Sequence, residues 1–287
     1  MTSYSIGSER LSLSVLQHII ADDLTLSLSK FAERSINNCR KYLNQKISDT
    51  SSPIYGINTG FGYLQNVIIP NGQLSQLQHN LLLSHACGTG DFVPAEIIKL
   101  MLLLKIQSLA FGNSGINLST VERLICMYNN NVLPVIYTQG SLGASGDLAP
   151  LAHLALPLIG AGKVWLGDKA IDSADWLSRA RLKPLSLQSK EGLALINGTQ
   201  FMTAYGVYIL LKSKQLANWA DTIGALSADV FDCRIDPFKP LSHLIRPHRG
   251  REVFPLDGGH DPLLGKGVIV VPRKHEVLNH ELEAVGV

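Results

Sequence analysis

The sequence has little of what marks disulfide-rich, zinc-binding or secreted proteins. Its 287 residues include only four cysteines, at positions 39, 87, 126 and 233, and no two of them form a CxxC pair. Isolated thiols of this kind predict reduced cysteines in an intracellular protein, and they exclude a disulfide framework or a cysteine-ligated zinc site. No basic stretch followed by an apolar stretch opens the chain, so we expect no secretory signal and a cytoplasmic location.

Long uninterrupted apolar runs are missing as well. The two most apolar segments are residues 100–104, which Lys105 ends, and residues 148–162, which contain Pro150, His153 and Pro157. Neither reaches the roughly 18 uninterrupted apolar residues that a membrane-spanning helix requires. The sequence therefore predicts a soluble protein without a membrane partner.

Charge of one sign is also scarce. The chain has 25 basic and 23 acidic residues and a net charge of +2, which gives no field that would attract nucleic acid or an anionic membrane. The hydrophobic share of 46% is typical of a globular protein and excludes a disordered one.

Helical spacing of apolar residues dominates what is present. It predicts helices over residues 76–87, 94–111, 119–128 and 190–226, the last containing either one long helix or two. The second is apolar almost all round, which indicates deep burial. Ser119 and Glu122 form a capping-box pattern at the start of the third.

Strand signals are rare. Residues 163–166 and 170–171 flank Gly167 and Asp168 and predict a small hairpin. We therefore predict a mainly α-helical fold class, with glycine-dense loops between the helices as the place for binding and catalysis.

The densest of these loops, residues 140–147 (GSLGASGD), runs directly into an apolar stretch. As a phosphate-binding loop it lacks the Gly-Lys-Ser/Thr ending, and as a serine-hydrolase nucleophile elbow it lacks the final glycine. A plain glycine-rich turn capped by Ser145 or Asp147 is the simplest alternative. A fourth interpretation fits better, because Ala144, Ser145 and Gly146 form a tripeptide that can cyclise on its own backbone.

In that cyclisation the amide nitrogen of Gly146 attacks the carbonyl carbon of Ala144 and the ring loses water, after which Ser145 loses its hydroxyl group as a second water. The product is a methylidene-imidazolone (MIO), an electrophile that no natural side chain supplies. Small residues suit the reaction, because Gly146 has no side chain to hinder its nitrogen and Ala144 adds little bulk. A following helix N-terminus would favour the negative charge gained when a nucleophile adds.

Four segments of the chain resemble, in the same order, the aromatic amino-acid ammonia-lyases and aminomutases. They are residues 55–62 (YGINTGFG), 80–88 (NLLLSHACG), 141–152 (SLGASGDLAPLA) and 191–200 (EGLALINGTQ). The resemblance implies the N-terminal part of the fumarase/aspartase-like, histidine ammonia-lyase-type helical fold. It also implies a homotetramer whose electrophile is MIO, formed autocatalytically from Ala144, Ser145 and Gly146 with no external cofactor.

The resemblance further implies roles for residues outside the tripeptide. Tyr55 would remove a β-proton from the substrate, although a loop tyrosine by itself is more often a packing residue. Gly62 belongs to the same loop, whose glycines let it fold closely over a ligand. Asn197 lies in an apolar helical run, where an unpaired amide is costly, and we expect it to face the electrophile or the substrate. Gln200 is a second candidate there.

Ser84 and His85 match the positions that face the substrate ring in this family. A polar pair suits an imidazole ring, which needs hydrogen-bond partners when buried, and it resembles the histidine ammonia-lyase branch. Tyrosine-specific members can also carry a histidine nearby. The expected reaction is therefore deamination of L-histidine to trans-urocanate and ammonia, with a lyase or aminomutase acting on tyrosine or phenylalanine as the alternative.

The likeness fades after residue 250. We therefore divide the chain into a lyase-like helical domain over residues 1–250 and a divergent tail over residues 251–287. The family segment with the arginine for the substrate carboxylate is represented only by residues 260–262 (HDP), which leaves a catalytically incompetent, truncated remnant as an open alternative. His275 and His280 are five apart and cannot share a helix face as in HExxH, so we expect no metal site.

Overall fold

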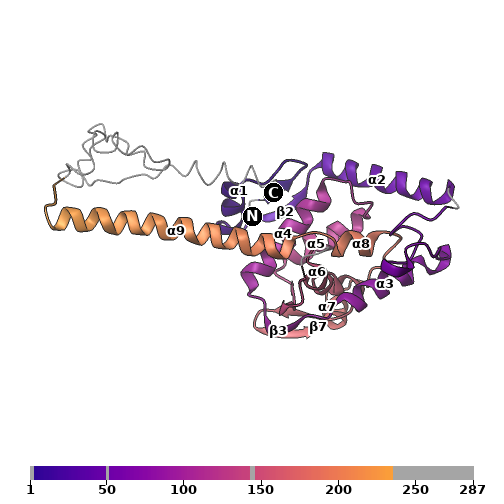
Figure 1. The fold of residues 1–287 in the computed structure, drawn as a ribbon. Helices are drawn as coiled ribbons and strands as arrows, with labels where there is room; N and C mark the ends of the chain where they lie inside the picture. The colour runs from indigo at the N-terminus through magenta and orange to yellow at the C-terminus, as the bar shows by residue number, and fades with distance from the viewer. Residues whose placement is uncertain (1–2, 50–51, 143–145, 235–287) are drawn as a thin grey trace. The chain divides into compact units, whose positions relative to one another are not determined.

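The computed structural model describes residues 3–49, 52–142 and 146–234, and the chain divides into two units. The first unit runs from Met1 to Ile209 and the second from Leu210 to Val287. Helices predominate in the described residues, which confirms the predicted fold class (Figure 1). Among the described helices, none combines the length and the apolar character that a membrane crossing needs. The predicted boundary at residue 250 lies outside the described residues and stays a prediction.

The core of the first unit is built around helix α4 (Ala95–Ala110), which is buried on nearly all sides as its sequence predicts. Pro94 occupies the N-cap position, so the observed helix is one residue shorter at each end than the apolar pattern indicates. Helix α4 packs against α5 (Leu118–Asn129) and α2 (Lys30–Asp49). Its central position matters for the site, because one side chain of α4 reaches the end of another helix.

The predicted capping box of α5 is wrong. Asn117 is the N-cap residue and Ser119 lies inside the first turn, where it cannot cap the helix. No side-chain capping bond forms at Asn117; instead, the buried carboxylate of Glu191 accepts hydrogen bonds at this helix end from Asn117 N at 3.0 Å and Thr120 Oγ1 at 2.7 Å. Sequence spacing favoured the local pair, whereas the partner that satisfies these donors lies some seventy residues away.

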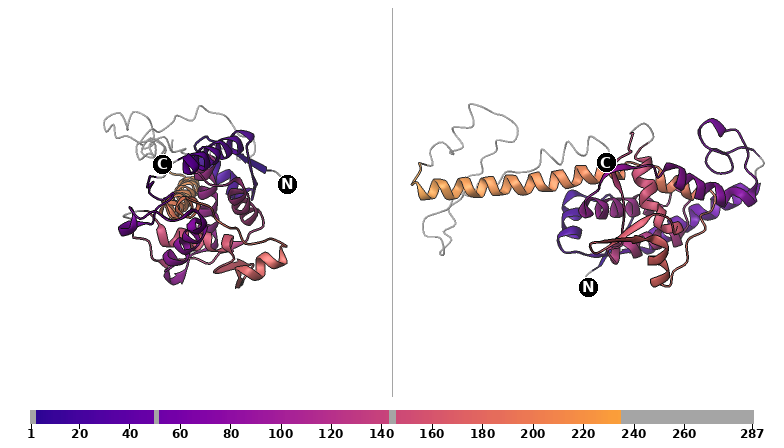
Figure 2. Two further views of the ribbon diagram at one scale, coloured as in Figure 1. Left: turned by 90° about the vertical axis from the view of Figure 1, so that its right-hand side faces the viewer. Right: turned by 90° about the horizontal axis from the view of Figure 1, so that it is seen from below.

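The N-terminal elements were not predicted from the sequence. Strand β1 (Ser3–Ile6) pairs in parallel with β2 (Thr25–Leu28), and α1 (Leu13–Ala21) connects them (Figures 1 and 2). The side chain of Asn129 extends the edge of β2, because it both donates to and accepts from the backbone of Leu26. The strands are too short, at four residues each, for an alternating pattern to stand out.

The remaining strands are short and antiparallel. Strands β6 (Lys163–Leu166) and β7 (Lys169–Asp172) form the predicted hairpin, and β4 (Leu133–Pro134) pairs with the other edge of β6. A second pair joins β3 (Thr89–Phe92) to β5 (Tyr137–Gln139). This second pair sets the path of the chain, because β3 follows the end of α3 and β5 leads into the glycine-dense loop.

Three helices of the first unit pack pairwise against one another and position the site. They are α3 (Leu74–His85), α6 (Leu148–Ala155) and α8 (Glu191–Ile196). Helix α6 continues as the 3₁₀ helix η3 (Leu156–Ile159), and α7 (Ser173–Arg179) follows the hairpin. Two further 3₁₀ turns, η1 (Gly62–Leu64) and η2 (Asn71–Gln73), lie in the segment before α3.

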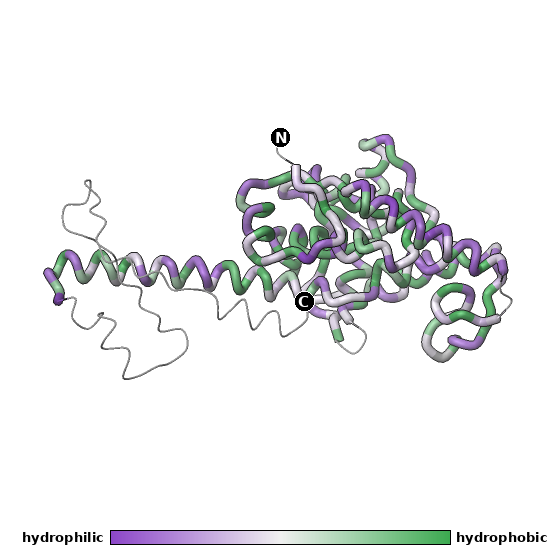
Figure 3. The backbone as a smooth tube through the Cα atoms, turned by 90° about the horizontal axis from the view of Figure 1, so that it is seen from above, coloured by the Kyte–Doolittle hydropathy of each residue, from purple (hydrophilic) through white to green (hydrophobic). Residues whose placement is uncertain are grey.

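The fourth predicted helical stretch contains two helices, of which α8 is the first and α9 (Gln200–Val230) the second. The two are separated by Asn197, Gly198 and Thr199, and the φ of +133° at Gly198 excludes a continuous helix. The described part of the second unit consists of the remainder of α9 and a short segment ending at Arg234. Hydrophobic and hydrophilic residues alternate along α9 (Figure 3).

Candidate active site

The last turn of α3 carries Ser84 and His85. Nδ1 of His85 lies 2.9 Å from the carbonyl oxygen of Leu81 and 3.1 Å from Ser84 Oγ. Because a carbonyl oxygen can only accept, Nδ1 carries a proton and donates to Leu81 O. In the neutral ring this tautomer leaves Nε2 as the acceptor. Ser84 is exposed and His85 is half-buried, so both side chains are open to a ligand at this helix end.

Gly88, three residues after α3, is fixed by His153 of α6. Gly88 N donates to His153 Nε2 at 3.0 Å, which requires that nitrogen to be unprotonated, and burial of the ring lowers the pKa of His153 accordingly. A side chain on Gly140 would come within 3.1 Å of the Cα atom of Gly88. This close approach brings the segment after α3 against the start of the glycine-dense loop.

Gly146 is pressed against Gly198. The two residues form an isolated parallel bridge, and a Cβ atom on Gly146 would collide with the carbonyl oxygen of Gly198. The φ of Gly146 is +92°, in the region that favours glycine. Only a residue without a side chain fits, as the cyclisation of the tripeptide also requires at this position. The described end of the tripeptide therefore suits a MIO group, whereas Ala144 and Ser145 lie outside the described residues.

Asp147, the residue after Gly146, connects three segments. Its N–H donates to Gly198 O at 2.8 Å, and its fully buried carboxylate accepts from Ser141 Oγ at 2.7 Å and from Met202 N at 3.0 Å. One carboxylate thus ties the start of the loop, the start of α6 and the first turn of α9 together. Charge-assisted bonds of this kind are stronger than neutral ones, so the segment on each side of the tripeptide is firmly held.

Asn197 does not lie inside a helix, which corrects the expectation drawn from its apolar neighbours. It is the C-cap residue of α8, and its side chain is exposed rather than buried. Its carbonyl oxygen accepts a hydrogen bond from Lys105 Nζ of α4 at 2.8 Å. Gln200 lies at the first residue of α9, where its buried Oε1 has no partner among the described residues. A Cβ atom on Gly198 would collide with that Oε1.

Tyr55 lies on the loop before α3 and is 56% exposed, with its ring nearly perpendicular to that of Phe61 at a centroid distance of 6.1 Å. Its neighbour Gly56 has a φ of +71°, and a Cβ atom there would collide with Leu193 of α8. The loop carrying Tyr55 therefore packs directly on the helix whose end carries Asn197.

The Tyr55 loop is shaped mainly by one buried side chain. Asn58 accepts from Ile54 N through Oδ1 and donates to Ser52 O through Nδ2. Ser189 Oγ donates to the carbonyl oxygen of Ile57 and joins the loop to the residues just before α8. Gly62 lies further along the loop at the start of η1, with a φ of +56° and open space around it.

The structure thus links most of the predicted site residues through the helices that carry them. Gly146 and Asn197 lie on adjoining backbone segments, Tyr55 lies on a loop packed against α8, and Ser84 and His85 end a helix that contacts both α6 and α8. The predicted tail residues, including residues 260–262, His275 and His280, lie outside the described residues. Within the described part of the chain, no cluster of His, Cys, Asp or Glu could hold a metal ion.

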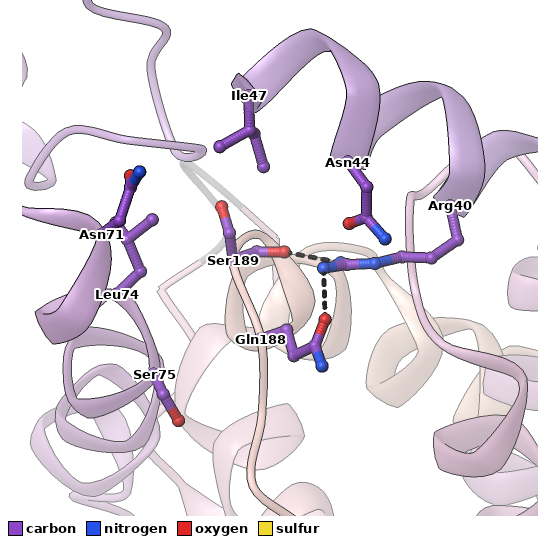
Figure 4. A pocket seen from close by; sticks show the side chains of 8 residues that line it. All are labelled: Arg40, Asn44, Ile47, Asn71, Leu74, Ser75, Gln188 and Ser189. Carbon is purple, nitrogen blue, oxygen red and sulfur yellow. Dashed lines mark hydrogen bonds between the residues drawn. The ribbon is translucent and has the colours of Figure 1, made fainter. Parts of the chain in front are cut away.

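A pocket of about 370 Å³ is lined in part by Ser189, the residue that joins the Tyr55 loop to the segment before α8 (Figure 4). It contains none of the predicted site residues. It is lined by Arg40, Asn44, Ile47, Asn71, Leu74, Ser75, Gln188 and Ser189.

Arg40 is the charged residue of this pocket and is almost fully buried. Its guanidinium donates to the carbonyl oxygens of Gly115 and Ser189 at 2.9 and 2.8 Å and to Gln188 Oε1 at 2.8 Å. Burial lowers the pKa of Arg40, and the nearby carboxylate of Glu191 opposes that shift. Through these contacts Arg40 connects α2 to the loops that precede α5 and α8.

Three residues of this arrangement carry no role in the sequence-based site: Lys105, His153 and the hydrogen-bonded carboxylate of Asp147. Lys105 and His153 stand out in the sequence as isolated polar residues in apolar helices, which is the available signal. Their partners lie 92 and 65 residues away, so no local pattern identifies what they bind.

A family model described as aromatic amino acid lyase matches residues 11–254. Together with the helical fold and the glycine junction, this match shows that the chain belongs to the aromatic amino acid lyases.

Individual relatives narrow the comparison. The chain is 44% identical to histidine ammonia-lyase of Deinococcus radiodurans over 240 residues, which are 84% of this chain and 46% of that protein. It is 42% identical to histidine ammonia-lyase of a Geobacillus strain over 239 residues, or 83% of this chain and 47% of that one. The chain therefore spans about half the length of the curated relatives it matches.

Solved structures agree on the fold. Histidine ammonia-lyase from Trypanosoma cruzi superposes with a TM-score of 0.77 and 34% identity, covering 86% of this chain and 48% of that one. Tyrosine aminomutase from Streptomyces globisporus gives a TM-score of 0.80 and 27% identity, covering 99% and 53%. These neighbours confirm the predicted ammonia-lyase-type helical fold.

Proposed function

We propose that this chain contributes the active-site region of a cytoplasmic ammonia-lyase that converts L-histidine to trans-urocanate and ammonia. Curated relatives that match most of the chain at about 43% identity are named histidine ammonia-lyases. The observation that carries the proposal is the junction of Gly146 with Gly198. A glycine that tolerates no Cβ atom stands where the ring-closing nitrogen of the tripeptide has to be.

In this proposal the MIO group, formed from Ala144, Ser145 and Gly146 with no external cofactor, supplies an electrophile that activates the substrate for loss of ammonia. Tyr55 is the base. Its deprotonated oxygen takes the β-proton and becomes a phenol, the Cα–N bond breaks as the Cα=Cβ double bond forms, and the protonated amino group leaves as ammonia. The 56% exposure of Tyr55 supports this role, because its side chain is accessible to a ligand.

Other residues bind and orient the substrate. Ser84 and His85 supply polar groups for an imidazole ring, and the His85 tautomer set by Leu81 O presents Nε2 as an acceptor for a ring N–H. Asn197, exposed at the end of α8 beside Gly146, offers an amide to the electrophile or the substrate. Gly62 keeps the Tyr55 loop free of a side chain at a position with open space around it.

Lyases or aminomutases acting on tyrosine or phenylalanine share this scaffold, and tyrosine aminomutases are among the structural neighbours. The polar pair favours histidine, because burying Ser84 and His85 against an apolar ring would leave their hydrogen-bonding groups unsatisfied.

We also propose self-association into a homotetramer. Five apolar residues of α9 are exposed at spacings of three and four: Leu216, Trp219, Ile223, Leu226 and Val230. This is the spacing of a helix that packs against other helices.

The function is tested by incubating the purified chain with L-histidine, L-tyrosine and L-phenylalanine and measuring the unsaturated acid and ammonia released. We expect urocanate and ammonia in equal amounts from histidine, none with Ser145→Ala, and a raised KM with His85→Leu. Turnover that Ser145→Ala retains would contradict the proposal. Preferential release of the tyrosine or phenylalanine product would reassign the substrate, and the β-amino acid would indicate an aminomutase.

A further inference from the structure

Lys105 is a buried titratable residue to which the proposed reaction gives no role. It lies in the middle of α4, is 1% exposed and is surrounded by the apolar core. Within the described part of the chain, no carboxylate forms an ion pair with it. Burial lowers the pKa of Lys105 to about 7. A lysine kept at such a position is costly, since a leucine or methionine would fill the same space without desolvating an amine.

The described partner of Lys105 is a single backbone atom. Nζ donates to the carbonyl oxygen of Asn197 at 2.8 Å, across 92 residues of sequence. Asn197 is the C-cap of α8, and the carbonyl groups at a helix end have no partner within the helix. Lys105 therefore reaches from the core to the point where the chain leaves α8.

The residues after Asn197 connect this contact to the tripeptide. Gly198 follows directly, its carbonyl oxygen accepts from Asp147 N at 2.8 Å, and its backbone is bridged to Gly146. Gly198 has a φ of +133°. Because glycine lacks a side chain, its own backbone angles are only weakly restrained at this position. An external hydrogen bond one residue earlier is a direct way to fix where the Gly198 carbonyl points.

We propose that Lys105 is a positioning residue: by holding the carbonyl group of Asn197, it sets the Gly198 peptide against Gly146 and Asp147 and so orients the amide nitrogen that closes the ring. The inference rests on the proposed function for the ring closure, whereas the positioning itself concerns only described residues. Lys105 acts through Asn197 and Gly198, which adjoin Gly146, the described end of the tripeptide.

A general packing role for Lys105 makes a different prediction. Replacing a buried lysine that has no ion-pair partner among the described residues by methionine of similar length removes a desolvation cost and should leave global stability unchanged or raised. If Lys105 only fills space, local order near Gly146 should follow the global change. If it positions Gly198, order there should fall while global stability does not.

The experiment compares Lys105→Met, Lys105→Arg and wild type by amide hydrogen exchange and thermal unfolding. The matched control is Lys99→Met, which makes the same chemical change on α4 at a lysine that contacts Asp23 and the ring of Tyr128 instead. Every variant is measured in a Ser145→Ala background, where the tripeptide cannot mature. We expect about tenfold faster exchange of the Asp147 amide in Lys105→Met, partial recovery in Lys105→Arg, and no change in Lys99→Met.

Exchange at Asp147 that is unchanged in Lys105→Met would overturn the positioning role, and so would a loss of protection spread evenly over the first unit. A parallel measurement with Ser145 intact follows the loss of two waters by intact mass, where Lys105→Met should mature more slowly than wild type. A wild-type chain that loses no water would count against the proposed function, and the exchange comparison would still decide the role of Lys105.

Discussion

The fit of Gly146 against Gly198 is the strongest single constraint at the scale of the residue. Gly146→Ala would place a methyl group on a backbone carbonyl oxygen that the Asp147 amide already holds, and it would also strain the positive φ. We expect a loss of about 1–3 kcal/mol in the free energy of unfolding, together with failure of the tripeptide to lose two waters. Urea unfolding and intact mass measure the two effects.

Gly206→Ala is the control for this substitution, because Gly206 lies within α9 with no neighbour close to an added Cβ atom. There the extra methyl group should stabilise by roughly 0.5–1 kcal/mol. Equal effects of the two substitutions would contradict the close fit at Gly146.

His153 makes stability depend on pH. Burial lowers its pKa in the folded state, so the unfolded chain takes up a proton first as the pH falls below about 6.5. The contribution of the neutral ring is complete above that pH and is lost progressively below it, until the pH falls below the lowered pKa of the folded state, where the ring is protonated and the bond from Gly88 is broken. Wild type should therefore lose more stability than His153→Gln on acidification from about pH 7 to about pH 5. Parallel slopes for the two proteins in this range would refute the assignment.

Residue types and their order predict the chemistry of the site better than its geometry. The glycine-dense tripeptide and the Ser84–His85 pair are visible in the sequence, because their chemistry depends on neighbours in the chain. The bonds of Asp147 to Met202 and of Lys105 to Asn197 are not visible, because they join residues 55 and 92 positions apart. The prediction that Asn197 lies inside a helix was wrong for a related reason. The helix ends before Gly198, and the contact of Gly198 with Gly146 is not visible in the local sequence.

At the scale of the element, Arg40 couples α2 to the loops that precede the site helices. Arg40→Met would leave the carbonyl oxygens of Gly115 and Ser189 without this donor, and each unsatisfied buried group costs about 1–3 kcal/mol. Thermal unfolding should show a clearly lower Tm, and limited proteolysis should show earlier cleavage near Ser189.

Arg34→Met is the matched control, since Arg34 is an exposed arginine of the same helix. Its Tm should stay close to that of wild type. If the Tm of Arg40→Met were also unchanged, the hydrogen bonds from Arg40 to these loops would not contribute to stability.

The elements themselves were predicted unevenly. Helices α3, α4 and α5 match their predicted ranges to within two residues at each end, because most of their buried positions are apolar and recur at helical spacing. Helix α2 was missed since its buried face includes Arg40 and its other faces are polar. Arg40 is tolerated in the core because its guanidinium donates hydrogen bonds to three acceptors from distant parts of the chain: the carbonyl oxygens of Gly115 and Ser189 and the side chain of Gln188.

At the scale of the whole molecule, the exposed apolar residues of α9 predict association. Substituting both Leu216 and Ile223 by glutamate would place charges at two of the exposed apolar positions, which are 70% and 59% accessible. We expect a lower molar mass in light scattering coupled to gel filtration. Gln215→Glu, which adds a charge at a neighbouring exposed position, should leave the mass unchanged. An association state that survives both glutamates would show that α9 is not the contact surface.

The measurement that bears most directly on the central claim is the intact mass of the purified chain beside Ser145→Ala. Cyclisation and dehydration of Ala144, Ser145 and Gly146 each remove one water, so formation of the electrophile lowers the mass of the chain by two waters. The account predicts a wild-type chain lighter by two waters and a variant at its calculated mass. A wild-type chain at its full calculated mass would contradict the account, because the electrophile on which the proposed deamination depends would not have formed.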